Sequence, residues 1–326
     1  MEQEESSSRL RYFPIPLFAS IMGVLGLTIV LQRASHVYGY PHFIATIGVV
    51  LGIGMFLLFS FVYFLKFLKY KEEVIAEFNH PIRLNFFPAY SICMLLMAIA
   101  LSPIHEGISY IVWYAGMILH LFFTLYVIRF WIVNNMLIEH SNPAWFIPIV
   151  GNVIVPIMGV EYIGLEVSMF FFSIGIFFWV VLFTIILNRI MFHHQLPKKF
   201  LPTLFIFIAP AGVGFLAYTK ILTVLNGEPS LDLFSYFIYD VGLFFTILLA
   251  FMIKEFIKLP FSLTWWAYTF PLAAITLATI LKYEITGSIY SFYIGHILIF
   301  TTIALLTLVT YKSIGAAFKK EICIKE

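Results

Sequence analysis

Charged residues are scarce in this chain. Asp, Glu, Lys and Arg make up 11% of the 326 residues, and 62% of the residues are hydrophobic, whereas soluble domains carry about 25% charged residues. A soluble fold cannot bury so much apolar surface, so the composition indicates an integral membrane protein. Runs of Lys and Arg of the kind that bind nucleic acid are also missing, which excludes that class of partner.

Cysteine is nearly absent as well. Cys93 lies in an apolar run and Cys323 lies near the C-terminal end, and two isolated cysteines make neither a disulfide framework nor a metal site. The first eight residues are acidic and polar, and no small-residue cleavage site follows the first apolar run. We therefore expect that first run to remain in the protein as a membrane helix.

What the chain does contain is a series of long apolar stretches. Roughly 20 apolar residues span the hydrocarbon core of a membrane, and ten stretches meet that length, one of them interrupted only by Asp240. They cover residues 12–32, 34–65, 84–105, 107–128, 140–160, 167–188, 200–219, 233–253, 259–281 and 285–311. They leave no room for a soluble domain, so we expect residues 1–326 to form a single transmembrane domain with short tails at 1–11 and 317–326.

The basic residues predict the orientation of these spans. Fifteen Lys and Arg fall in one set of alternate connections and the two terminal segments, while the opposite connections carry three, namely Arg33, Lys220 and Lys282. Because Lys and Arg accumulate in cytoplasmic loops, we expect both termini in the cytoplasm of a multi-pass protein in a bacterial inner (plasma) membrane.

Proline recurs at nearly constant spacing in alternate spans. The odd-numbered spans contain a proline near their start or middle, and the even-numbered spans have none in their interior and are richer in Phe, Leu and Ile. These prolines are Pro16, Pro88, Pro148, Pro210 and Pro271. The pattern predicts an all-α fold of five helical hairpins, with an inner ring of five bent, small-residue-rich helices around a lumen and five lipid-facing helices outside. The simpler alternative is that prolines are common in membrane helices, which accounts for any one of them but not for the spacing.

Few polar side chains in the spans offer chemistry. Arg129 and Asp240 are charged, but they lie at different depths on even-numbered spans, where snorkelling or a contact between subunits explains them. The histidines do not form a metal set, and isolated His120 and His296 are typical of hydrogen bonds between helices. The chain carries no motif of a hydrolase, a phosphate-binding loop or a metalloprotease. We therefore expect no enzyme activity, no cofactor and no metal.

The neutral segments around the prolines are the candidate lining of the lumen. Helix breaks expose backbone N–H groups, which favour anions without holding them tightly. In residues 265–280 (WWAYTFPLAAITLATI), Phe270 precedes Pro271 at the expected bend, and its ring is the candidate plug. The alternative is that Phe270 is ordinary packing between helices. The candidate lining and kink residues are Pro16, Phe87, Pro88, Pro148, Asn152, Pro210 and Pro271.

Four segments in order along the chain carry a family resemblance. These are HPIRLNFFPAYS at 80–91, NPAWFIPIVGNVIVP at 142–156, LPTLFIFIAPAGVGFLAY at 201–218, and the 265–280 segment. They resemble the tellurite-resistance/dicarboxylate transporter family, which includes bacterial TehA and the plant guard-cell slow anion channels. The resemblance implies ten helices in a pseudo-five-fold ring, a homotrimer with one pore per subunit, and an occluding phenylalanine that falls on Phe270 through the YTFP motif. The long tails of the plant members are not seen, so control by a kinase through such tails is not expected.

Three functions remain open at this point. The first is a channel for small monovalent anions such as chloride or nitrate, favoured by the neutral inner spans and the resemblance. The second is a secondary transporter or exporter of dicarboxylates or oxyanions such as tellurite, which the family name favours and the lack of an ionisable residue in the middle of an odd-numbered span disfavours. The third is a sensor or scaffold that conducts nothing.

Overall fold

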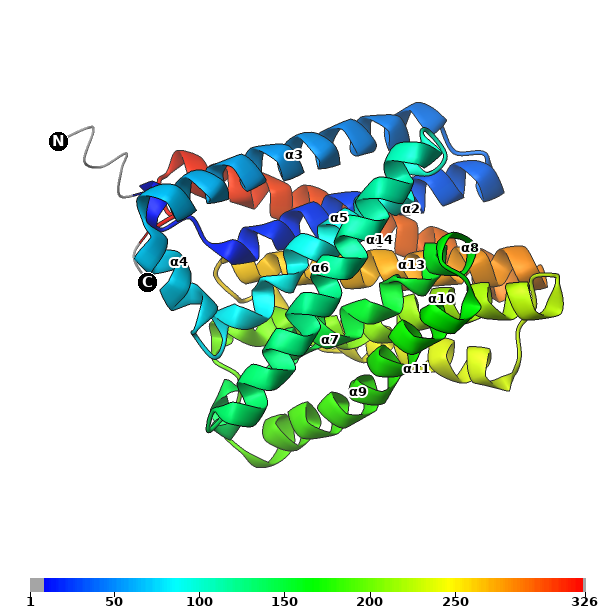
Figure 1. Cartoon of the computed structure of the whole chain (residues 1–326). Coiled ribbons are helices and arrows are strands. Elements are labelled where there is room, and N and C mark those ends of the chain that lie inside the picture. Colours follow the sequence, from blue (N-terminus) through cyan, green and yellow to red (C-terminus); the bar gives the residue numbers. More distant parts are fainter. Residues whose placement is uncertain (1–8, 325–326) are drawn as a thin grey trace.

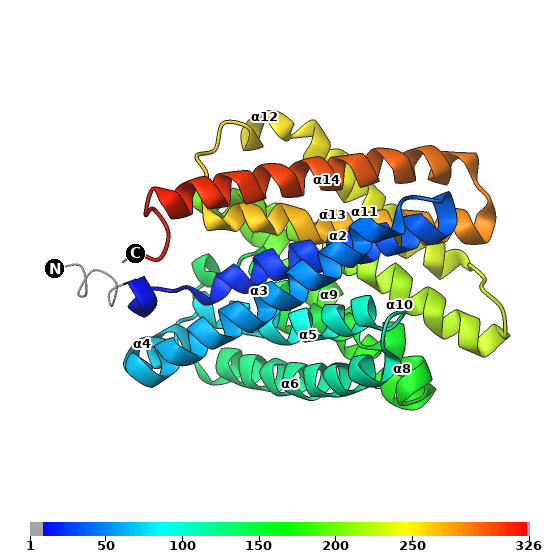
Figure 2. The same ribbon diagram turned by 90° about the horizontal axis from the view of Figure 1, so that it is seen from above.

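The computed structural model describes residues 9–324, and they form an all-helical bundle without β-strands in that range (Figure 1). Ten helical stretches are long and apolar enough to cross a membrane, which confirms the number predicted from the sequence. The predicted tails at 1–11 and 317–326 lie partly outside the described residues. Figure 2 shows the chain entering and leaving at the same end of the bundle, which we call the terminal end; the other is the far end.

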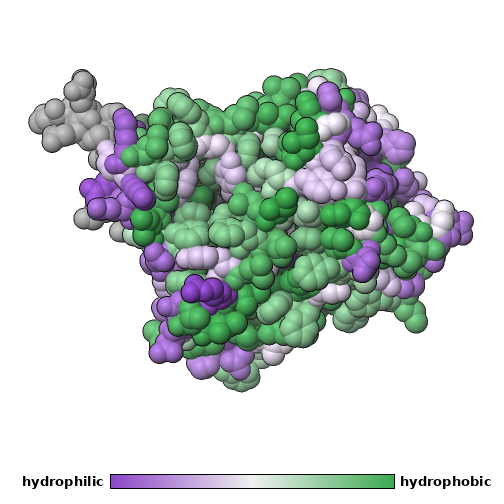
Figure 3. Space-filling model, in the orientation of Figure 1, coloured by the Kyte–Doolittle hydropathy of each residue, from purple (hydrophilic) through white to green (hydrophobic). Residues whose placement is uncertain are grey.

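Odd- and even-numbered spans differ sharply in burial. In the most apolar window of each odd-numbered span 67–89% of the residues are buried, against 17–39% in the even-numbered spans. We therefore call them inner and outer spans. The outer spans are single helices: α3 (His42–Lys69), α6 (Glu106–Val133), α9 (Leu165–Phe192), α11 (Leu233–Phe251) and α14 (Ile289–Phe318). Figure 3 shows apolar side chains across the middle of the visible face and polar side chains towards its two ends, as expected of a surface that meets lipid.

Each inner span begins at the terminal end with a 3-10 segment and continues as α-helix. The first, third, seventh and ninth spans pair η1 (Ile15–Leu17) with α2 (Phe18–Tyr38), η2 (Arg83–Phe86) with α5 (Pro88–Leu101), η6 (Lys198–Phe207) with α10 (Ile208–Asn226), and η7 (Leu263–Tyr268) with α13 (Thr269–Thr286). The fifth is more broken: η4 (Pro143–Trp145), α7 (Phe146–Val150), η5 (Gly151–Ile154) and α8 (Pro156–Tyr162). Short elements α4 (Lys71–Phe78), η3 (Ile138–His140) and α12 (Ile253–Phe256) lie in connections at the terminal end.

The ninth span changes helix type earlier than the sequence predicts. The sequence predicts a bend in the middle of residues 265–280, but the structure changes from 3-10 to α between Tyr268 and Thr269, and Pro271 is the third residue of α13. Proline suits the first turn of an α-helix, because the N–H that it lacks has no intrahelical partner there. The proline therefore accompanies the change of helix type at the start of α13 and does not interrupt it.

The inner spans contact one another in a closed series. Along the series α2 contacts α5, α5 contacts α7 and η5, η5 and α8 contact α10, α10 contacts α13, and α13 contacts α2. Each outer helix packs against the inner span before it and also against the inner span that follows: α3 against α5, α6 against α7, α9 against α10, α11 against α13, and α14 against α2.

Small residues bring α13 close to both of its inner neighbours. A Cβ atom added at Gly23 of α2 would lie 2.2 Å from Thr269 Oγ1, and one added at Gly212 of α10 would lie 2.8 Å from the carbonyl carbon of Ala274. Glycine is therefore required for these helices to approach as they do. α13 is therefore packed closely against α2 and α10 at these positions.

Candidate functional site

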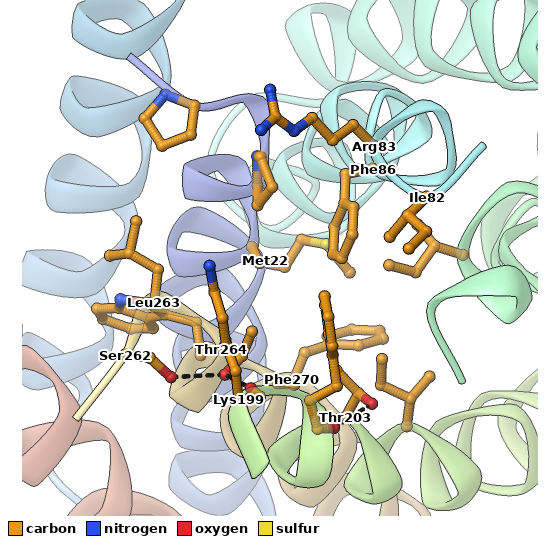
Figure 4. Close-up of a pocket in the computed structure, with 18 of the residues that line it drawn as sticks. Met22, Ile82, Arg83, Phe86, Lys199, Thr203, Ser262, Leu263, Thr264 and Phe270 are labelled. Atoms are coloured by element: carbon orange, nitrogen blue, oxygen red, sulfur yellow. Dashed lines mark hydrogen bonds between the residues drawn. The ribbon is translucent and has the colours of Figure 1, made fainter. Parts of the chain in front are cut away.

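A cavity of about 700 Å³ enters the bundle from the terminal end. All five inner spans contribute to its lining, and among the described residues the outer spans contribute only Lys66 at the end of α3 and Ala316 near the end of α14. Figure 4 shows Met22, Phe86, Thr203 and Phe270, from four different inner spans, directed towards this space. The cavity therefore lies between the five inner spans.

The cavity ends about halfway along the inner spans. The lining residues furthest along each of these spans are Met22, Ile92, Ile154, Val213 and Pro271, and all of them are apolar. Beyond Pro271, the next five residues of α13 are buried. The inner end of the cavity is thus an apolar constriction.

Phe270 lies at this inner end. Its neighbours Thr269 and Pro271 are buried, whereas Phe270 itself is only half-buried because it borders the cavity. A Cβ added at Gly26 would lie 3.4 Å from Phe270 Cδ2, so the ring is in van der Waals range of α2. The benzyl group therefore occupies space between α13 and α2 at the level where the cavity stops.

The mouth of the cavity carries charges of both signs. Arg11, Arg83 and Lys199 line it, together with Glu73, Glu77 and Glu321. Arg11 Nε donates to Glu73 Oε1 over 2.7 Å, which ties the N-terminal segment to α4. The lining residues that lie deeper on the inner spans are uncharged among those described. The cavity therefore has a charged rim and a neutral inner wall.

His80 is the histidine at this mouth. Its Nδ1 accepts hydrogen bonds from the backbone N–H groups of Ile82 at 3.1 Å and Arg83 at 3.3 Å. Burial lowers the pKa of His80, and the nearby charges of Arg83 and His140 lower it further. The imidazole is consequently neutral at pH 7, and its lone pair caps the start of η2.

A buried ion pair anchors the outer edge of the mouth. Lys66 Nζ lies 2.9 Å from Glu77 Oε2 and donates to the Phe13 carbonyl over 2.8 Å. Tyr63 donates its hydroxyl to the same carboxylate oxygen over 2.8 Å. The Lys66 and Glu77 side chains are 1% and 8% exposed. This network joins α3, α4 and the segment that precedes η1.

Half of the residues expected to line the lumen border the cavity. Pro16, Pro210, Phe270 and Pro271 line it, whereas Phe87, Pro88, Pro148 and Asn152 are not among the described lining residues. Phe87 packs against Phe78, with ring centroids 4.8 Å apart. Pro148 and Asn152 face Thr124 of α6. The Thr124 Oγ1 donates to the Pro148 carbonyl over 2.7 Å and accepts from Asn152 Nδ2 over 2.8 Å. Adjacent helical residues point in different directions, so Phe86 faces the cavity while Phe87 faces outwards. Gly151, next to Asn152, borders the cavity through its backbone.

Four of the lining residues that the sequence reasoning missed lie in pairs with a spacing of three. Thr203 and Ile206 line the cavity from η6. Thr264 and Ala267 line it from η7, six and three residues before Phe270. Side chains three apart eclipse in a 3-10 helix. Counting back in threes from Phe270 therefore finds Ala267 and Thr264, once the helix type is known.

The charged residues of the spans at the far end make contacts away from this cavity. Asp240 Oδ1 lies 3.7 Å from Lys282 Nζ at the far end, and Lys220 there lies 2.6 Å from Glu161. Arg33 pairs with Glu284 on α13. Asp240 therefore has a partner within its own subunit. In residues 9–324 no group of three or more His, Cys, Asp or Glu is placed to hold a metal ion.

Comparisons with known proteins agree with this architecture. A family model described as SLAC1, voltage-dependent anion channel, matches residues 12–314. An uncharacterized transporter of Methanocaldococcus jannaschii is 27% identical over 88% of this chain and 90% of its own length. The S-type anion channel SLAH2 of Arabidopsis thaliana is 34% identical over 84% of this chain, which spans about half (54%) of that channel. The tellurite resistance protein TehA homolog of Haemophilus influenzae is 23% identical over 88% of this chain and 84% of its own length.

Proposed function

Because the chain belongs to the SLAC1 family of voltage-dependent anion channels, we propose that it conducts small monovalent anions, such as chloride or nitrate, through a pore along the axis of the inner spans. A general role in anion transport follows from the family. The choice of a channel, the permeant ions and the gate are our proposals.

The cavity lining is the observation that carries this proposal. All five inner spans contribute to it, and its deeper part is uncharged. All five inner spans also begin at the terminal end, so the positive ends of their helix dipoles surround the cavity. A neutral wall with a diffuse positive potential attracts anions without trapping them, as rapid conduction requires. The closed series of contacts between inner spans supports a pseudo-five-fold ring around the pore.

Phe270 is the proposed gate. It borders the cavity where the lining ends, and its ring lies in van der Waals range of α2 at Gly26. A benzyl group in an apolar constriction excludes water, and a dry constriction blocks ions. Movement of this ring, or of α13 against α2, would let water and anions pass.

A carrier for dicarboxylates or oxyanions such as tellurite is the second candidate. The names of the Haemophilus and Methanocaldococcus relatives favour it. Proton- or sodium-coupled carriers use ionisable residues deep in the membrane, and the described inner lining provides none. The channel therefore remains the better proposal.

Recording from the purified protein in a planar bilayer under a potassium chloride gradient tests the function. We expect unitary currents that reverse near the chloride equilibrium potential and that shrink when gluconate, a bulky anion, replaces chloride. Reversal at the potassium potential would contradict anion selectivity. Saturable, proton-dependent anion flux into liposomes without unitary current would favour the carrier.

Orientation and assembly complete the proposal, with both termini cytoplasmic and three subunits that each contain a pore. In a Cys323→Ser background, an impermeant maleimide added to intact cells is expected to label a cysteine at exposed Glu228 and not one at exposed Asn79. Cys93 is buried and does not interfere. The opposite labelling pattern would contradict the proposed orientation.

Native mass spectrometry is expected to give three times the subunit mass, and a monomer would refute the trimer.

A further inference from the structure

His120 of α6 lies directly behind the cavity wall. It is fully buried, and its Nδ1 lies 2.9 Å from Ser91 Oγ of α5. The Ser91 hydroxyl donates its single proton to the Pro88 carbonyl over 2.8 Å. Nδ1 of a neutral His120 therefore carries the ring proton and donates to Ser91. The other ring nitrogen, Nε2, is left with its lone pair.

Nε2 of His120 is directed at the wall of the cavity and has no hydrogen-bond partner. A Cβ added at Gly151 would lie 2.6 Å from this nitrogen and 2.8 Å from Ile92 Cδ1. Gly151 and Ile92 both line the cavity. The Gly151 backbone and the end of the Ile92 side chain thus lie between the imidazole and the proposed pore.

A second unpartnered polar atom accompanies it. Asn152 is fully buried and follows Gly151 in η5, and its Nδ2 donates to Thr124 Oγ1 and to the Ile149 carbonyl, whereas its Oδ1 has no partner. A buried polar atom without a hydrogen bond destabilises a fold, because it has lost its water and gained nothing in return. One such atom belongs to η5 and the other to a side chain that contacts it, so a polar species at this break in the fifth span would give both a partner.

We propose that His120 takes up a proton at Nε2 and, as an imidazolium, holds a small inorganic anion at the Gly151 position of the pore wall, so that anion binding and flux rise as the pH falls. The inference rests on the proposed function, because it assigns a binding subsite to the proposed conduit. A rotation of the Ile92 side chain opens the gap between Nε2–H and the cavity.

Proton and anion bind together at this subsite. An imidazolium buried without a counter-charge is strongly disfavoured, and an anion beside it removes most of that cost. By linkage, the anion then raises proton affinity as much as the proton raises anion affinity. At high pH the neutral imidazole offers only a lone pair to the cavity, and that lone pair does not attract anions.

The groups facing His120 carry no competing charge. The titratable side chains of α5 are Tyr90 and Cys93; Tyr90 packs on Phe18 and Phe56, and Cys93 donates to the Phe18 carbonyl, so both face α2 and α3. α7 and η5 contain no titratable side chain. On α6 itself, Thr124 faces the same cluster, and Arg129 is exposed more than two turns away. His120 therefore dominates the local charge when it is protonated.

The test compares wild type with His120→Gln, and with His120→Phe in case the first variant folds poorly. Between about pH 7.5 and about pH 5.5 wild-type chloride flux into liposomes is expected to rise about fivefold, because the bound anion favours protonation of the buried imidazole. A fivefold rise is equivalent to about 1 kcal/mol in anion occupancy. Both variants are expected to show no rise. Because His80 also borders the cavity, His80→Gln serves as a control, and His296→Gln, on α14, serves as a second; both are expected to keep the pH response.

A binding readout separates this inference from the proposed function. The melting temperature of detergent-purified protein is measured in sodium chloride and in sodium gluconate at equal ionic strength. Chloride is expected to stabilise wild type more at the lower pH, and to lose that effect in His120→Gln. If neither wild type nor any variant conducts but this stabilisation persists, the conduction proposal fails and the subsite stands. A full pH response in both His120→Gln and His120→Phe would overturn the subsite, and so would loss of that response in His80→Gln. The subsite would also be overturned if wild type showed neither pH-dependent flux nor pH-dependent stabilisation.

Discussion

Replacement of Phe270 by alanine is expected to raise anion conductance about tenfold or more, and a tenfold rise corresponds to about 1.4 kcal/mol less in the barrier to passage. The substitution removes the benzyl ring at the apolar inner end of the cavity, and water then wets the constriction. Macroscopic current per reconstituted protein, with chloride as the main permeant ion, measures the effect. Phe270→Leu is expected to give an intermediate current because it keeps part of the side-chain volume.

Phe244→Ala is the matched control for this prediction. Phe244 lies on α11 and is 59% exposed on the lipid-facing surface, so its loss removes the same group from a helix that does not line the cavity. We expect wild-type current from this variant. An unchanged current in a folded Phe270→Ala protein would refute the gate, and an equal rise in Phe244→Ala would point to non-specific leak.

The second large effect is expected at the buried ion pair of the mouth. Glu77→Gln leaves the ammonium group of Lys66, which is 1% exposed, without a counter-charge, and removal of one partner of a buried pair costs about 3–5 kcal/mol. Because the glutamine oxygen still accepts from Tyr63 and Lys66, we expect the lower end of that range. Thermal unfolding of the purified protein measures the loss as a reduced melting temperature.

Two further variants isolate the buried charge as the cause. Lys66→Met combined with Glu77→Leu removes both charges, and a buried pair replaced by apolar residues is often neutral or stabilising; the double variant is expected to recover most of the lost stability. Glu73 lies on the same helix as Glu77, α4, and Glu73→Gln breaks its exposed ion pair with Arg11. Exposed ion pairs contribute little to the free energy of unfolding. Equal losses in Glu73→Gln and Glu77→Gln would contradict a special role for burial.

Several features were predictable because they depend on composition and periodicity. Ten apolar stretches predicted ten spans, and the described residues contain ten helices long and apolar enough to cross a membrane. The difference between proline-containing and continuously apolar stretches predicted which spans are buried, because only helices with small residues and breaks pack closely on several sides. Phe270 was singled out by its place before Pro271, and the structure brings it to the cavity. Its action as a gate stays a prediction.

Other features depend on the register and contacts of particular side chains. The sequence pointed to Phe87 and Asn152, one residue away from the cavity-facing Phe86 and Gly151, because the change from α to 3-10 geometry rotates the register and leaves no pattern in hydropathy. Lys66 resembled one more basic residue of a cytoplasmic loop until the fold of α4 placed Glu77 beside it.

The sequence by itself determined that this chain crosses a membrane ten times and which spans are buried, because solvation by lipid acts on every residue according to its polarity alone. Only the tertiary structure decided which side chains border the cavity, and that His120 lies against Gly151. Those outcomes depend on helix type and on contacts between residues far apart in the chain, and no local pattern encodes them.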